Sequence, residues 1–167
     1  QGLTTQQVGE AVIGPSMARL DMSFESGDAY LDFWKAHPAF TDSWSESLEQ
    51  YFLADLVGQP PALRSGVNKE AILGDTASQL MSNTVADSLP KIASKLYLLR
   101  APRGIMDDEP LYSNERVIEL GDSLLSLVVT NLEDVNHYTI MLGEKGAAQV
   151  AAFVRELFAD KAMKKLG

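Results

Sequence analysis

The sequence contains no cysteine, fewer basic than acidic residues (14 against 23) and no long apolar run. The absence of cysteine excludes disulfide bonds, thiolate nucleophiles and cysteine-ligated zinc. The net charge of −9 at pH 7 argues against nucleic acid and anionic membrane surfaces as partners, because both require a basic surface. No apolar run approaches the roughly 20 residues that a membrane-spanning helix needs. We therefore expect neither a nucleic-acid partner nor a membrane partner.

The first residues are polar and lack the basic region that opens a secretory signal peptide, so we expect a cytoplasmic location. The chain of 167 residues, 46% of them hydrophobic, is long enough for one domain with a core of its own.

Residues 1–90 show the patterns of short helices rich in aromatic side chains, and no convincing strand pattern. Serine or asparagine precedes three of these helices as a typical N-cap: Ser26, then Ser43 or Ser45, then Asn68. The pair Pro60-Pro61 predicts an extended linker between the second and third of them. This half of the chain is therefore predicted to be helical.

The pattern changes after Pro90. Leu96–Leu99 is a continuous apolar run, typical of a strand buried on both faces, and Leu127–Leu132 is a second strand rich in β-branched residues. A helix from Ser113 to Leu120 separates them, and a helix from Glu144 to Phe158 with a buried apolar face follows. This order predicts a parallel strand pair with a crossover, and so a helix-rich α/β fold in which residues 91–167 form a β-α-β-α unit.

Each predicted strand ends at a polar loop: the first loop carries Asp107, Asp108 and Glu109, and the second carries His137. A carboxylate and a histidine are two of the three members of a hydrolase triad, the orienting acid and the general base. Because Asp107 and Asp108 are adjacent, their side chains diverge and only one can face His137. Asp108 is favoured, Asp107 is a close alternative and Glu109 is third. A solvated acidic turn and a histidine that hydrogen-bonds the backbone are the non-catalytic alternatives.

The same acidic residues lack the ligand spacing that would identify a metal, so we expect no metal ion and no cofactor. The nearest match to the nucleophile motif G-x-S-x-G is residues 14–18, with Ser16 at its centre. That motif needs a strand before the serine and a helix after it, and a short apolar run with Pro15 is a poor substitute. The other histidine, His37, precedes Pro38 and is interpreted as a cap at the C-terminal end of a helix.

Four aromatic residues of the helical part are candidates to line an apolar substrate pocket: Trp34, Trp44, Tyr51 and Phe52. The alternative, equally weighted, is that they hold the helices together, since aromatic side chains dominate small cores.

The element order, from helical segment through strand, acidic loop, helix, strand and histidine loop to final helix, resembles the C-terminal half of a bacterial α/β-hydrolase. Leu96–Arg100 and Leu127–Leu132 look like the last two strands of that fold, and Val135–Tyr138 looks like its histidine turn. The stretches GPSMARLDMSF, DAYLDFWKAHPAF and WSESLEQYFLADLVG look like its helical cap.

The resemblance implies that residues 1–90 are a cap or lid and that residues 91–167 are the C-terminal part of the hydrolase core. It implies a serine-type hydrolase of an ester or other carbonyl compound, with a small-molecule substrate, His137 as base and Asp108 or Asp107 as acid. The nucleophile and the oxyanion hole are not recognisable in these residues, so we expect a fragment of a larger hydrolase that is inactive alone.

The alternative function is a non-catalytic helical interaction or oligomerisation module. Two parallel strands leave edges and apolar faces unpaired, which predicts a homo-oligomer that covers them.

Overall fold

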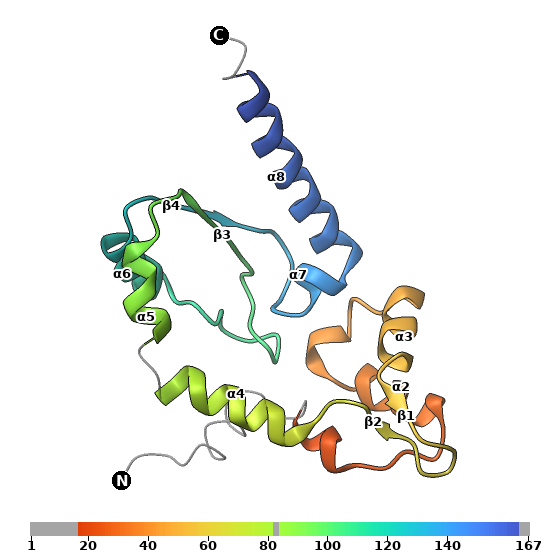
Figure 1. Cartoon of the computed structure of the whole chain (residues 1–167). Coiled ribbons are helices and arrows are strands. Elements are labelled where there is room, and N and C mark those ends of the chain that lie inside the picture. The colour runs from red at the N-terminus through yellow and green to blue at the C-terminus, as the bar shows by residue number, and fades with distance from the viewer. Residues whose placement is uncertain (1–16, 82–83, 164–167) are drawn as a thin grey trace.

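The computed structural model describes residues 17–81 and 84–163. A helical segment comes first: η1 (Arg19–Asp21), α2 (Gly27–Lys35), η2 (Pro38–Phe40), α3 (Glu46–Leu53), β1 (Leu56–Val57), β2 (Arg64–Ser65), α4 (Lys69–Met81), α5 (Thr84–Ser88) and η3 (Leu89–Lys91). A strand segment follows: β3 (Leu96–Arg100), α6 (Asn114–Ser123), β4 (Leu127–Asn131), α7 (Thr139–Leu142) and α8 (Glu144–Met163). Figure 1 shows α2 and α3 packed together beside the β1–β2 hairpin, and α4 leading from them toward the strand segment.

Side-chain caps start four of the helices where the sequence places a short polar residue. Ser26 accepts a hydrogen bond from the amide of Ala29 (3.1 Å) and Ser45 accepts one from Leu48 (3.3 Å). Asn68 and Ser113 do the same for α4 and α6 (2.9 and 3.2 Å). Each cap satisfies one of the amides that an α-helix leaves unpaired at its first turn.

The core lies in the helical segment and is aromatic. The rings of Trp34 and Phe52 stack with centroids 4.4 Å apart, and the ring of Trp44 also stacks on Phe52, with centroids 5.7 Å apart. Tyr30 and Phe40 are fully buried beside them. The face of α2 that carries Tyr30, Leu31 and Trp34 is therefore the face that this core covers.

The expectation of no strand before residue 90 was wrong. β1 and β2 pair as a short antiparallel hairpin, with Leu56 opposite Ser65, and Phe24 makes an isolated bridge to Leu63. Pro60 and Pro61, joined by a cis peptide, lie in the turn of this hairpin rather than in an extended linker. Gly58 has φ of 100°, and a Cβ there would approach the carbonyl oxygen of Ala62 to 2.9 Å. Strands of two residues are too short to produce a recognisable alternation.

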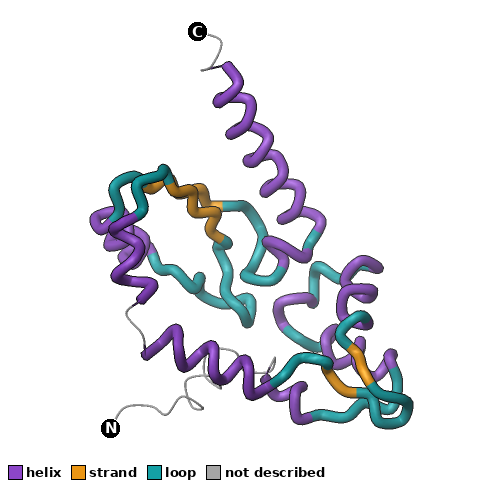
Figure 2. Tube along the Cα trace, in the orientation of Figure 1, coloured by secondary structure: helices purple, strands orange, loops and turns teal. Residues whose placement is uncertain are grey.

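β3 and β4 form the expected parallel pair, with Leu96 opposite Leu127 and Arg100 opposite Asn131. Figure 2 shows the two strands together, with loops joining them to the neighbouring helices. Every residue of β3 is only half-buried, so the expectation of burial on both faces was wrong. Phe153 of α8 packs its ring against Tyr97 of β3, with ring centroids 5.7 Å apart. No residue of either strand is fully buried.

Helix α8 extends to Met163, beyond the expected end at Phe158, and projects away from the rest of the protein (Figure 1). Its expected buried face is largely exposed: 67% of Phe158 is accessible to solvent, and Ala147, Ala148 and Val154 are exposed as well. Helical periodicity correctly located an apolar face, but the described residues supply little to cover it. No helix within residues 17–81 and 84–163 has the length and apolar character to cross a bilayer.

Candidate functional site

The loops that follow β3 and β4 meet at the carboxyl ends of these strands, the edge of a parallel sheet where ligands usually bind. A parallel bridge joins Arg103 of the first loop to Asn136 of the second. The amide of His137 also donates a hydrogen bond to the carbonyl oxygen of Gly104 (3.4 Å). The two loops that carry the predicted acid and base are therefore held side by side.

His137 lines an open groove of about 370 Å³ at this edge. The groove is mainly apolar, and its lining includes Leu98, Leu111, Tyr112, Ile140, Met141 and Val150. Partial burial against these side chains lowers the pKa of His137 below 6.5. The imidazole is therefore neutral at pH 7, which is the protonation state that a general base requires. Two cationic residues, Arg100 and Arg103, line the same groove.

The carboxylate of Asp107 is held by two donors. Its Oδ1 accepts from Arg103 Nε and from Asn136 Nδ2, both at 2.8 Å. These contacts fix the residue in a left-handed conformation (φ 62°), which is uncommon for a residue with a side chain.

Asp108 and Glu109 are more exposed than Asp107. Asp108 Oδ1 lies over Gly104, only 2.5 Å from where a Cβ on that glycine would be. Gly104 is the residue whose carbonyl accepts from the His137 amide. Among the described residues, however, neither Asp107 nor Asp108 hydrogen-bonds the His137 ring. The structure brings both carboxylates into the loop beside the histidine without forming an acid–imidazole pair.

An ion network continues from Asp107 along the outside of the histidine loop. Arg103 also approaches Asp134 (3.3 Å), and Asp134 in turn accepts from Lys145 (2.7 Å). The hydrogen bond from Lys145, followed by that from Arg103, lowers the pKa of Asp134. The hydrogen bond to Asp107 is the largest cause of the raised pKa of Arg103. The network thus links two carboxylates, Asp107 and Asp134, to two cations, Arg103 and Lys145.

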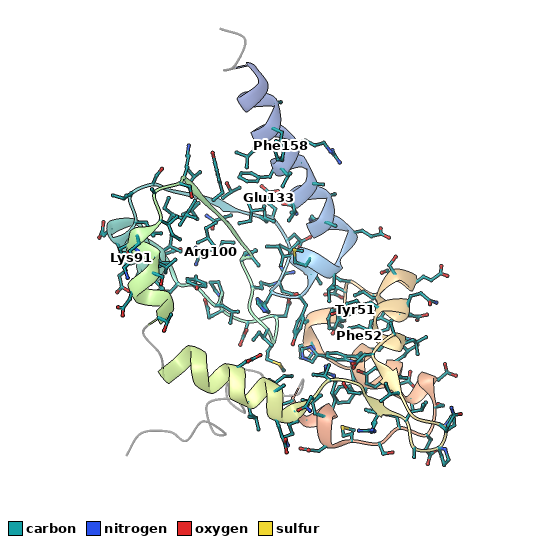
Figure 3. All side chains as sticks on the ribbon, in the orientation of Figure 1. Tyr51, Phe52, Lys91, Arg100, Glu133 and Phe158 are labelled. Atoms are coloured by element: carbon teal, nitrogen blue, oxygen red, sulfur yellow. The ribbon has the colours of Figure 1, made fainter. Side chains whose placement is uncertain are left out.

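Three of the four candidate substrate-binding aromatics, Trp34, Tyr51 and Phe52, line a second hollow of about 450 Å³. Tyr138, the residue after His137, lines the same hollow. Figure 3 labels Tyr51 and Phe52 on α3. They lie on the side of the helical segment that faces the strand segment. Phe52 and Trp34 are also core residues, whereas Tyr51 is exposed. Trp44 instead lines a third, polar hollow of about 490 Å³ together with Arg103, Asp107 and Asp134.

The sequence predicted that His37 caps the C-terminal end of α2. In the structure it instead caps the start of η2. Its Nδ1 accepts from the amide of Ala39 (3.2 Å), which places the ring proton on Nε2. Nε2 is buried and has no partner among the described residues. The ring edge meets Tyr138 with centroids 5.6 Å apart, so this histidine packs between the helical segment and the histidine turn. Pro38 has moved the chain out of α2 before this position.

Ser16, the nearest match to a nucleophile, lies outside the described residues. Within the described ranges, no three acidic or histidine side chains come together in a way that could hold a metal ion. Sequence reasoning missed Asn136, which contacts both loops, although its position directly before His137 was a usable signal.

No family model matches the sequence, and no curated protein matches it. Two solved structures are similar in fold. E-2-(acetamidomethylene)succinate hydrolase aligns with 93% of this chain at 14% identity and a TM-score of 0.63. A Rickettsia typhi protein described as a hydrolase aligns with 85% at 7% identity and a TM-score of 0.56. This chain spans about half of each of those chains (53% and 47%). The fold is therefore that of part of an α/β-hydrolase, as the sequence resemblance implied.

Proposed function

We propose that this chain is the cap and acid–base portion of a larger serine-type α/β-hydrolase, and that the nucleophile belongs to a part of that hydrolase outside these 167 residues. His137 is the general base that takes the proton of the nucleophile and passes it to the leaving group. The substrate is a small ester or other carbonyl compound. E-2-(acetamidomethylene)succinate hydrolase is named for a compound with carbonyl groups, and its fold match supports this substrate class by analogy.

One observation carries the proposal: a neutral histidine lines an apolar groove at the carboxyl ends of two parallel strands, in a partial α/β-hydrolase fold. An apolar wall excludes water from a reacting carbonyl group and strengthens the electrostatic interactions of the base.

For the orienting acid we propose Asp108, with Asp107 as the alternative. The Oδ1 atom of Asp107 is already engaged by Arg103 and Asn136. The carboxylate of Asp108 forms no hydrogen bond within the described residues and lies over Gly104, beside the His137 backbone. Both oxygens of the Asp108 carboxylate are therefore available to accept a hydrogen bond from the imidazole of His137.

The helical segment is proposed as the lid, because its aromatic residues Trp34, Tyr51 and Phe52 line a hollow shared with Tyr138. In this arrangement a substrate contacts Trp34, Tyr51 and Phe52, and its reacting carbonyl lies toward His137. Trp44, the fourth candidate, borders the separate polar hollow with Arg103 and Asp107.

The test uses the protein encoded by the complete reading frame, assayed with p-nitrophenyl esters of increasing acyl length. His137→Gln should lower kcat by about 10²–10⁴-fold, the usual contribution of a general base. Asp108→Asn should lower kcat more than Asp107→Asn. A His137→Gln enzyme with unchanged kcat would refute the role of His137, and a larger effect of Asp107→Asn would transfer the acid role to Asp107.

The isolated chain supplies a second measurement. A fluorophosphonate probe should label no serine in it, because the nucleophile lies elsewhere. Labelling of Ser16 or of any other serine in this chain, with matching esterase activity, would contradict an external nucleophile.

A second function, homo-oligomerisation, is supported by a separate observation: several large apolar side chains of the strand segment are exposed. They include Leu125, Met141, Val154 and Phe158. We propose that a second copy of the chain covers them when the strand segment has no other partner. Light scattering at micromolar concentration should give at least twice the monomer mass of 18.2 kDa, and a monomer would refute it.

A further inference from the structure

Asn136, which directly precedes His137, is one of the most completely buried polar residues described: 2% of it is exposed. A buried amide must find partners for its donors and acceptor, or it costs folding free energy. This side chain finds partners on three separate stretches of the chain.

The donor side of the amide points away from the histidine turn. Asn136 Nδ2 donates to the carbonyl oxygen of Ala39 and to Asp107 Oδ1, both at 2.8 Å. Ala39 belongs to η2 in the helical segment, and Asp107 belongs to the loop after β3. One NH₂ group therefore ties the histidine turn to the helical segment and to the acidic loop.

The acceptor side holds the turn itself. Asn136 Oδ1 accepts from the amides of Tyr138 (3.0 Å) and Thr139 (2.9 Å) and from the Thr139 hydroxyl (3.1 Å). The Thr139 hydroxyl accepts in return from the Asn136 amide (2.8 Å). The side chain of Asn136 therefore binds the amides of the two residues that follow His137. These hydrogen bonds close a tight turn around His137 and restrict rotation of the His137 backbone.

We propose that Asn136 is a positioning residue for His137, which fixes the imidazole at the wall of the apolar groove and couples it to the helical segment. The role rests on the proposed function of His137, since Asn136 would act only through that ring. Other side chains do not match this geometry: no aspartate supplies two donors, and glutamine is too long for the same turn.

The experiment is an NMR titration of the isolated chain, which contains only two histidines. In Asn136→Ala the turn is released and the His137 ring leaves the groove wall. Its pKa, lowered by partial burial in the native chain, should rise toward 6.5. The imidazole ¹⁵N shifts should move as well, because ring orientation and tautomer are no longer fixed.

Leu48→Ala is the matched control for lost stability. Leu48 is a fully buried core residue of α3, distant in sequence from the turn. It should lower Tm without moving the pKa or the ¹⁵N shifts of His137. If Asn136→Ala, like Leu48→Ala, lowers Tm but leaves the pKa and the ¹⁵N shifts of His137 unchanged, Asn136 is merely structural and the proposal is overturned.

Asn136→Asp is the second variant, for use if the alanine variant fails to fold. It keeps the acceptor for Tyr138 and Thr139 but loses both donors, so it should release the link to Ala39 and move the His137 shifts. Asn131→Asp, at the exposed end of β4 and 3.5 Å from Arg100 of the same groove, measures the effect of an added negative charge without loss of the Asn136 hydrogen bonds. Asn136→Asp shifts no larger than those of Asn131→Asp would overturn the proposal. None of these readouts needs hydrolysis, so their failure is distinct from a failure of His137→Gln to lower kcat.

Discussion

Phe40 and Phe158 are the same side chain in opposite surroundings. Phe40, in the helical segment, is fully buried among Trp34, Trp44 and Phe52. Phe158, on α8 of the strand segment, is 67% exposed. The helical segment thus contains its own core, whereas the strand segment has apolar faces without equivalent cover. An apolar pattern in the sequence specifies which face will be buried, but a second element must still cover that face.

The largest effect should come from breaking the helical core. Phe40→Ala is expected to lower the free energy of unfolding by about 3–5 kcal/mol, because it removes a fully buried ring and leaves a cavity. Urea denaturation of the isolated chain measures the loss. A loss below about 1 kcal/mol would mean that the core is loosely packed, and would remove the contrast with the strand segment.

A smaller effect should come from the polar network inside that core. Tyr30 donates to Asp55 (2.5 Å), which also accepts from Ser65 (2.7 Å) and lies 3.7 Å from Arg19. Tyr30→Phe should lower the free energy of unfolding by about 1–3 kcal/mol, since Asp55 loses a buried donor.

The same network predicts an alkaline limit. Burial, and then the hydrogen bond to Asp55, raises the pKa of Tyr30 above 10.0. The folded state binds this proton more tightly than the unfolded state, so the stabilisation is complete below pH 10 and is lost as the pH rises through the folded pKa. Tyr30→Phe should flatten stability above pH 10 relative to the native chain. Parallel curves for the two proteins would contradict the buried phenol.

His37 tests the junction between the two segments. Burial lowers the pKa of His37 below 6.5, so the folded state binds a proton less readily than the unfolded state. Stability should be complete above pH 6.5 and fall as the pH drops below it, because protonation of Nδ1 removes the acceptor for the Ala39 amide.

His37→Asn keeps a capping acceptor and removes the titration, so its urea midpoint should depend less on pH between about 7.5 and 5.5. The pKa of His137 is also lowered by burial, so His137→Gln is needed to separate its contribution to the pH dependence from that of His37. An unchanged pH dependence in His37→Asn would assign the effect to other groups.

The smallest effect should come from the exposed face of the strand segment. Phe158→Ala should change the free energy of unfolding of a monomer by less than about 0.5 kcal/mol, as is usual for surface positions. In an oligomer that covers this face, the same change should instead weaken association, visible as a lower mass in light scattering. Substantial destabilisation of a monomer would show that α8 is covered, and would break the comparison.

Much of the local structure was predictable, because its causes are local. Ser26, Asn68 and Ser113 start their helices through contacts to amides three residues away. The parallel pair of β3 and β4 followed from two apolar runs separated by a helix, which is a pattern of the right length for a crossover.

The rest depends on contacts between distant residues. Burial of α8 could not be read from its periodicity, since spacing carries no information about a covering element. The position of Asp107 depends on hydrogen bonds from Arg103 and from the side-chain amide of Asn136. The partner of that amide in the helical segment, Ala39, is 97 residues away in the sequence.

That separation has a kinetic consequence. Most contacts of the aromatic core lie between Phe24 and Phe52, so this core closes only short loops and should form early during folding. The bond from Asn136 to Ala39 closes one of the longest loops in the chain, and long-range contacts of this kind form late. The amides of Tyr138 and Thr139, which depend on Asn136, should therefore gain protection from hydrogen exchange after those of α2 and α3 during refolding.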